Sequence, residues 1–330
     1  MLPHCLHSSL LKDLARTERN GESGVDPRKE ARPGWEYWAV RGLLGVLSRL
    51  PRSVARAVGA GVGLLAYAAA ARLRRVGRQN LAMALPELPE SSRQRILRTS
   101  FVRLGWQLAE FAHMRRYTRD NAQRYIRYEG LDNFLTAHER GKGVLVLTGH
   151  LGAWELSSFF HSLMGFPMAM VIRRLDNAPV DEYVNAIRTL HGNRVLHKDD
   201  FARGILKELH AGETVGILMD TNMTPPQGVF VPFFGKDACT ASGLARVAAH
   251  TGATVLPGFL LWEAAEKRYV LHFGEPLELV ETGAAEADAI ANTALFTAVL
   301  EDWIRRYPEQ WLWVHRRWKT RPAGEENFYR

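Results

Sequence analysis

The most constraining feature of this sequence is the alternation of short apolar runs with amphipathic stretches from about residue 142 onwards. Each run has the length and continuous hydrophobicity of a strand buried on both faces. The runs read GVLVLTGH, MAMVI, TVGILMD, TVLPGFLLW and RYVLHF. Between and after them, helical stretches are expected from about residue 156, near 180–190, near 200–211 and at about 286–306. We therefore predict an α/β fold with a mostly parallel central sheet and helices on both of its faces.

The N-terminal part of the chain has a different character. Residues 1–34 contain Gly, Pro and charged residues without a sustained apolar period, and we interpret them as a flexible tail. Lys12 and Asp13 interrupt their only apolar run, which argues against a secretory signal peptide. We expect a helical, membrane-associating segment at 35–78, the main domain at 79–322 and a C-terminal tail at 323–330.

The segment 35–78 contains a charge-free run of 15 residues, Ala57 to Ala71. As a helix this run spans about 22 Å, which is short of the roughly 30 Å hydrocarbon core of a bilayer. Two interpretations remain open. The run is either a buried Ala/Gly-rich core helix or an interfacial or marginally spanning anchor whose flanking arginines reach towards phosphates. The preceding stretch WEYWAVRGLLGVLSRL, which mixes aromatic residues with arginine, favours the anchor.

Charge is divided unevenly along the chain. Residues 1–125 contain 22 Lys or Arg against 10 Asp or Glu, a net +12, and the remainder contains 21 against 25, a net −4. A basic front end is typical of nucleic-acid binders and of proteins that lie on anionic membranes. Because no nucleic-acid recognition motif accompanies the charge, we expect no nucleic-acid partner.

Several kinds of site are excluded by their motifs. The two cysteines, Cys5 and Cys239, are too few for a disulfide framework or a closed thiolate zinc site. No His, Cys and carboxylate cluster has ligand-like spacing, so we expect no metal. GAGVG at 59–63 lacks the third glycine of a dinucleotide fingerprint, RGKGVL lacks the first glycine of a phosphate loop, and no Gly-x-Ser-x-Gly elbow is present.

The remaining candidate site is TGHLGAWE, residues 148–155. His150 falls where a buried strand ends and a helix begins, which is the usual place for sites in open α/β sheets. Glu155 follows five residues later, an offset of about 500° within one helix, so the two side chains do not share a helical face. They meet only if His150 lies in the turn and Glu155 in the helix, as Gly152 allows.

Five blocks of this chain resemble the lipid A biosynthesis acyltransferases, the lauroyl and myristoyl transferases of the lysophospholipid acyltransferase-like superfamily. The blocks are TGHLGAWEL, VIRRLDN, ILMDTN…VFVPFFG, ACTASGLAR and YPEQWLWVHRRWKTRP, and the resemblance runs from about residue 36 to about 322. It implies that His150 and Glu155 form the His-x4-Asp/Glu catalytic motif. It also implies that Arg173, Asn177 and Asp220 bind substrate.

The resemblance further implies an acyl thioester donor, acyl-ACP or acyl-CoA, with no other cofactor. The expected partners are acyl carrier protein, a lipid A precursor and the membrane surface, at the cytoplasmic face of the inner membrane. In this scheme His150 takes the proton of the acceptor hydroxyl, Glu155 accepts a hydrogen bond from the other ring nitrogen, and no covalent enzyme intermediate forms. Arg173 holds a phosphate, and the C-terminal cluster of tryptophans and basic residues at 311–321 suits a lipid headgroup region.

Other functions remain open on the residues alone. A related enzyme with a phosphatidylinositol mannoside or an ornithine-type lipid as acceptor uses the same chemistry. A membrane-binding module without activity, or an RNA-binding protein, also agrees with the basic front end.

Overall fold

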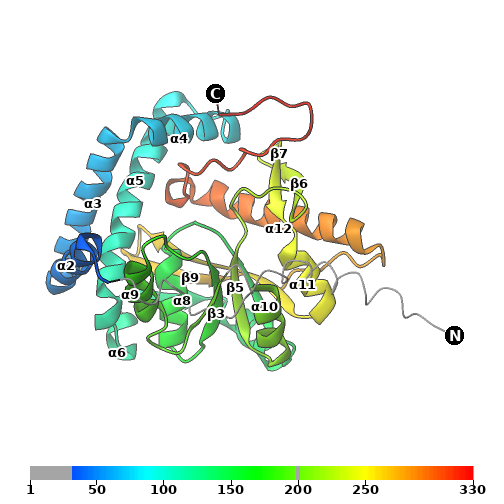
Figure 1. The fold of residues 1–330 in the computed structure, drawn as a ribbon, viewed down its shortest axis with the longest axis horizontal. Coiled ribbons are helices and arrows are strands. Elements are labelled where there is room, and N and C mark those ends of the chain that lie inside the picture. The colour runs from blue at the N-terminus through cyan, green and yellow to red at the C-terminus, as the bar shows by residue number, and fades with distance from the viewer. Residues whose placement is uncertain (1–31, 198–200, 330) are drawn as a thin grey trace.

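The computed structural model describes residues 32–197 and 201–329 (Figure 1). The predicted tail 1–34 therefore lies almost entirely outside the described residues. The helices in the described chain are α2 (Trp35–Arg49), α3 (Arg52–Ala69), α4 (Ala71–Ala84), α5 (Glu90–His113), η2 (Met114–Arg116), α6 (Arg119–Ala122), α7 (Leu131–Glu139), α8 (Trp154–Leu163), α9 (Ala178–Arg188), α10 (Phe201–His210), α11 (Gly243–Thr251), α12 (Ala285–Arg306) and η3 (Pro308–Gln310).

The strands form one large sheet and one separate hairpin. The strands are β1 (Ile126–Glu129), β2 (Val144–Thr148), β3 (Met168–Ile172), β4 (Arg194–His197), β5 (Thr214–Leu218), β6 (Gly228–Phe233), β7 (Lys236–Ala241), β8 (Thr254–Glu263) and β9 (Arg268–Phe273). The seven-stranded sheet has the order β1-β9-β8-β2-β5-β3-β4, and β6 and β7 form the hairpin. Only β8 and β9 pair antiparallel within the large sheet, so the predicted mostly parallel sheet is confirmed.

Alternate side chains of the central strand β2 enter two different cores, because successive residues of a strand point to opposite faces. Val144 and Val146 pack with residues of α5, α7 and α8 on one face. Leu145 and Leu147 pack with residues of α10, α11 and α12 on the other. The sheet is therefore covered by helices on both faces, as the alternating pattern predicts.

In Figure 1, α2, α3 and α5 stand at the left of this α/β core and α4 lies across its top. The segment 35–78 is helical as expected, but the predicted boundary at 78/79 falls inside α4.

The C-terminal residues 323–329, predicted as a tail, pack against the domain. Tyr329 is buried, donates to Asn80 Oδ1 at 2.8 Å and accepts from the Trp318 amide at 3.1 Å.

Most of the run at 57–71 lies in α3, which packs against α5 on one side. One face packs closely on α5 through glycines: a Cβ at Gly59 would lie 2.2 Å from the Gly105 carbonyl oxygen, and one at Gly63 would lie 2.1 Å from the Phe101 oxygen. Small residues let helix backbones approach this closely. The opposite face exposes Val58, Val62 and Leu65, the last to 70 %.

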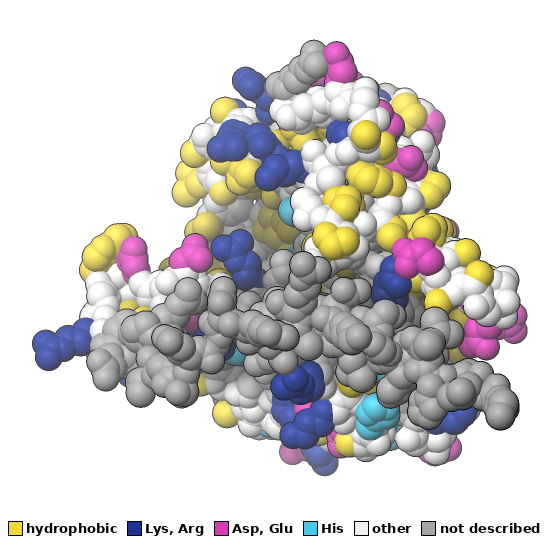
Figure 2. All heavy atoms as spheres, turned by 45° about the vertical axis from the view of Figure 1, so that its right-hand side comes forward, with side chains coloured by type: hydrophobic (Ala, Val, Ile, Leu, Met, Phe, Trp, Pro, Cys, Tyr) yellow, Lys and Arg dark blue, Asp and Glu magenta, His cyan; other side chains and the backbone are white. Residues whose placement is uncertain are grey.

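Exposed apolar side chains continue from α3 onto α2 and α4. They include Trp35 at 78 %, Trp38, Leu43 and Val46 on α2, and Leu73 on α4. In the space-filling view, hydrophobic and basic side chains lie side by side over the upper part of the molecule (Figure 2). Among the described helices, none is by itself long and apolar enough to cross a membrane, and one pair, α3 with α4, meets the length and composition test only together, across a bend of 89°.

The contact between α3 and α5 is testable with two neighbouring glycines. Gly59→Ala places a methyl group against the Gly105 carbonyl, so we expect a loss of about 1–3 kcal/mol, as in other overpacked contacts. Gly61→Ala has no atom within 4 Å of the new methyl group and replaces a poor helix former, so we expect a gain of up to about 1 kcal/mol. Thermal unfolding followed by circular dichroism separates the two variants, and equal midpoints would contradict the close contact.

Candidate active site

His150 and Asp220 meet because of the register of two neighbouring parallel strands. Thr148, the last residue of β2, pairs with Leu218, the last residue of β5. Residues two positions beyond these strand ends therefore reach the same carboxyl edge of the sheet, where open α/β folds place their sites. The turn after His150 depends on Gly152, which has φ of +68°, and a Cβ there would lie 2.0 Å from the Leu260 carbonyl oxygen.

The Asp220 carboxylate accepts three hydrogen bonds. The His150 imidazole donates from Nδ1 to Oδ1 at 2.8 Å, and the His150 backbone amide donates to Oδ2 at 2.7 Å. The Trp311 indole donates to Oδ2 at 2.8 Å. With Nδ1 committed to Asp220, the imidazole has its Nε2 left as a proton acceptor, and no other described residue hydrogen-bonds it.

The pKa values of the pair follow from this geometry. Burial lowers the pKa of His150, but the charge and hydrogen bond of Asp220, with a smaller contribution from Glu155, outweigh it and raise the pKa above its ordinary value. Burial raises the pKa of Asp220, but the charge of His150 and the hydrogen bonds from His150 and Trp311 lower it to about 2. Asp220 is therefore ionised at neutral pH, and the His150 imidazole keeps its proton to a higher pH than an ordinary histidine does.

The structure corrects the expectation that Glu155 holds the imidazole. Glu155 lies in the first turn of α8 and forms a bidentate ion pair with Arg188 at the end of α9, with Nε to Oε2 at 2.8 Å. An offset of five residues turns its side chain away from the strand end, and Asp220 on the neighbouring strand makes the hydrogen bond instead. Glu155 still acts on His150 through its charge.

Arg173 and Asn177 lie between β3 and α9, away from this pair. Arg173 is 82 % exposed and is 3.5 Å from Asp176 at their closest atoms. Asn177 caps α9 by accepting from the Val180 amide at 3.2 Å, and its side-chain amide donates to Glu36 on α2. Among the described residues, no hydrogen bond or ion pair joins either of them to His150, so their predicted role in substrate binding stays a prediction.

The C-terminal segment contributes to the site, and no motif in the sequence indicates this contribution. Residues 311–320 cross the carboxyl edge of the sheet: the Leu312 amide donates to the His150 carbonyl at 3.1 Å. The Asn222 amide donates to His315 Nε2 at 3.0 Å, and Asn222 also exchanges two hydrogen bonds with Thr320. Burial and the nearby His150 and Arg317 lower the pKa of His315, although Asp220 opposes them.

The aromatic and basic cluster at 311–321 is for the most part an interior feature, which corrects its assignment to a lipid headgroup region. Trp311, Trp313 and Trp318 are buried against Phe233 and Phe234 of the β6–β7 hairpin. Arg317 is fully buried and donates to the Cys239 carbonyl at 2.9 Å and to the Thr240 hydroxyl. The tryptophans of this cluster are therefore core residues. Arg317 is accommodated among them because it finds hydrogen-bond acceptors on β7.

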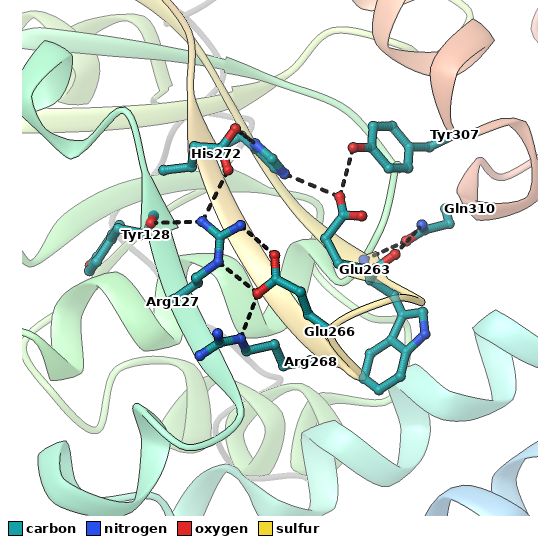
Figure 3. Close-up of polar contacts among 10 residues, drawn as sticks. Arg127, Tyr128, Glu263, Glu266, Arg268, His272, Tyr307 and Gln310 are labelled. Atoms are coloured by element: carbon teal, nitrogen blue, oxygen red, sulfur yellow. Dashed lines mark hydrogen bonds and ion pairs between the residues drawn. The ribbon is translucent and has the colours of Figure 1, made fainter.

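The start of the C-terminal segment is fixed to the β8–β9 hairpin (Figure 3). Tyr307 donates to Glu263 at 2.7 Å, and the Gln310 side chain pairs with the backbone of Trp262 through bonds of 2.9 and 3.0 Å. The Gln310 carbonyl then accepts from the Gly152 amide at 3.0 Å. These contacts place Trp311, the next residue, beside Asp220.

An ionised, buried carboxylate that holds a histidine with one free ring nitrogen is the arrangement of enzymes that take a proton from an attacking hydroxyl group. Among the described residues, no group of His, Cys, Asp or Glu side chains is placed to hold a metal ion.

Comparison with known proteins identifies the family. Residues 25–320 match the family described as bacterial lipid A biosynthesis acyltransferase, and the chain belongs to it. The chain is therefore an O-acyltransferase. It is similar to the lipid A biosynthesis palmitoleoyltransferase of Escherichia coli strain K12, with 29% identity over 89% of this chain and 94% of the relative. It is also similar to the lauroyltransferase of the same strain, with 28% identity over 89% and 95%, and to its myristoyltransferase, with 23% identity over 90% of each chain.

The contact between His150 and Asp220 predicts a pH effect. We expect the His150 imidazole to act as the base, which requires its neutral form. Activity should therefore fall as the pH drops below the raised pKa of His150. Asp220→Asn removes the charge that raises this pKa, so the acidic limb of kcat/KM should move to lower pH while the plateau falls by about 100-fold or more.

Glu155→Gln is the matched control, because it removes a carboxylate charge that does not bond the imidazole. Its acidic limb should move less than that of Asp220→Asn. Both profiles are measured on protein whose thermal unfolding midpoint has been checked. An unchanged limb in Asp220→Asn would contradict the assignment of Asp220 as the partner of His150.

Proposed function

We propose that this chain transfers a fatty acyl group from an acyl thioester, carried by acyl carrier protein, onto a hydroxyl group of a lipid A precursor. The observation that carries the proposal is the His150–Asp220 pair at the carboxyl edge of the sheet, with Nε2 unoccupied by any described residue. Membership of the lipid A acyltransferase family supports the acceptor class.

The reaction follows from the free ring nitrogen. As the acceptor oxygen attacks the thioester carbonyl carbon, its proton moves to Nε2 of His150, and Asp220 stabilises the resulting imidazolium. The tetrahedral intermediate then collapses, the C–S bond breaks and the thiol group leaves with the bonding electrons. The proton on His150 is available to that sulfur, so the pair returns to its starting state and the acyl group is an ester of the acceptor.

This route needs no acyl-enzyme. A thiol has an ordinary pKa of about 8.5 and is a good leaving group, so one proton acceptor is enough. The described cysteine, Cys239, lies buried in β7, where burial raises the pKa of its thiol and disfavours the nucleophilic thiolate. Among the described residues, no serine or cysteine side chain hydrogen-bonds His150.

Membrane association through α2 and α3 fits a lipid acceptor. Their outward faces carry Trp35, Trp38, Val62 and Leu65, while the flanking stretches carry arginines. An apolar face with tryptophan and basic residues at its margins lies in the interface of an anionic bilayer. We propose that the protein lies on the cytoplasmic face of the inner membrane with this face inserted.

Replacing His150 tests the function directly. His150→Ala should lower transfer to the uncatalysed level while leaving the protein folded, because the imidazole is the proton acceptor. The assay supplies labelled acyl-ACP or acyl-CoA with total lipid extract and identifies the product by mass spectrometry.

The same assay separates the rival acceptors. An acylated lipid A precursor supports the proposal, whereas an acylated phosphatidylinositol mannoside or ornithine lipid would replace it by a related glycolipid acyltransferase. Near-normal turnover in the His150→Ala variant would refute the general-base assignment. Vesicle binding without any thioester consumption by the wild type would point to a membrane-binding module without activity.

A further inference from the structure

A basic recess lies between α2, the turn η2 that follows α5, and α9. Its volume is about 250 Å³, and its lining includes Arg41, Ser48, Arg49, Arg115, Arg116 and Tyr183. No Asp or Glu side chain belongs to its lining. Four of its ten lining residues are arginines.

The four arginines are only partly engaged by the protein. Arg49 donates to the Gly45 carbonyl at 2.8 Å, and Arg116 donates to the Ser48 carbonyl, so both help to end α2. Arg41 donates to the Tyr37 hydroxyl at 3.0 Å, and Arg115 lies over the Tyr183 ring at 5.2 Å. Among the described residues, none of the four pairs with a carboxylate. Each guanidinium has five N–H donors, so most of the donors remain available.

Four like charges in one recess repel each other, and an anion between them relieves that repulsion. Guanidinium groups bind phosphate by paired N–H donors and keep their charge at any physiological pH. The absence of acids from the lining and the size of the recess fit a single phosphate group better than an extended acidic peptide.

The position of the recess indicates that the phosphate belongs to a lipid. The same helix α2 exposes Trp35, Trp38, Leu43 and Val46, and we propose that the two tryptophans enter the membrane. Arg41 lies 5.7 Å from the Trp38 ring centre, so recess and apolar face adjoin. A basic side chain beside an exposed tryptophan sits at the depth of lipid phosphates.

A chain of contacts connects the recess to His150. Ile187 of α9 lines it, and the next residue, Arg188, holds Glu155. Trp154, the neighbour of Glu155, packs edge-on against the His150 ring at 5.0 Å. A headgroup bound in the recess is therefore separated from His150 by the last turn of α9 and the start of α8.

We propose that this recess binds a phosphate monoester of the glycolipid acceptor and so holds the acceptor headgroup for acylation at His150. The proposal rests on the proposed function for the identity of the acceptor. It gives the phosphate a site other than Arg173, which lies exposed beside Asp176.

The double variant Arg41→Gln/Arg115→Gln, called the recess variant, tests the proposal, because neither arginine side chain hydrogen-bonds the backbone. The control Arg95→Gln/Arg98→Gln removes the same charge from exposed positions of α5 outside the recess. Kinetics are measured with detergent-solubilised lipid A precursor and with the same lipid after phosphatase treatment. The recess variant should raise KM for the phosphorylated acceptor about 10- to 100-fold with little change in kcat, and should leave the dephosphorylated acceptor and the control unaffected.

Two further arms identify a different occupant. Sedimentation with phosphatidylcholine vesicles, with and without phosphatidylglycerol, tests membrane phospholipid: a loss of binding in the recess variant with unchanged acceptor KM would overturn the assignment to the acceptor. A KM raised for acyl-ACP but not for acyl-CoA would overturn it in favour of a protein surface.

An equal effect of the recess variant on both forms of the acceptor would also overturn the assignment. If the wild type acylates neither form, the proposed function itself fails. The vesicle arm then still reports whether the recess binds lipid phosphate.

Discussion

The carboxylate of Asp220 is ionised and buried, so the cost of removing it from water has to be offset by hydrogen bonds within the protein. Its three donors come from the turn after β2 and from the C-terminal segment, which are about 160 residues apart in the chain. Removing one partner of such a buried charge costs about 3–5 kcal/mol. The reaction centre is therefore complete only when the C-terminal segment has docked, and its docking contacts at Gln310 and Asn222 serve the site as well as the fold.

The sequence predicts most of the sheet, because buried parallel strands are marked by their own composition. The runs that became β2, β3, β5, β8 and β9 are continuous and apolar, whereas β1 (IRYE) and β4 (RVLH) are short, partly polar edge strands that carry no such signal. The hairpin β6–β7 was also missed, since its apolar residues pack on the C-terminal tryptophans rather than in the sheet.

The candidate site shows what spacing alone leaves undetermined. That His150 lies in a turn at a strand end follows from the local pattern TGHLG. The local pattern does not show which carboxylate bonds the imidazole, because that depends on which strands lie beside β2 in the sheet. Strand β5 is one of the two neighbours of β2, and its register brings Asp220 to His150, while Glu155 pairs with Arg188 on α9. The motif predicts a pair of His150 with Glu155, whereas the strand order and register place Asp220 against the imidazole.

The two faces of α3 explain how a helix too short to span a bilayer is suited to lie on one. Backbone contact through Gly59 and Gly63 leaves no room for side chains between α3 and α5, so the valines and leucines of α3 are directed outwards. Because η2 directly follows α5, the contact between α3 and α5 also fixes where Arg115 and Arg116 lie relative to the apolar face of α3. The hydrogen bond from Asn177 to Glu36 joins α9 to α2, and the ion pair of Arg188 with Glu155 joins α9 to the first turn of α8. Through these contacts α2 and α3 are linked to α8, whose first residue, Trp154, packs against the His150 ring.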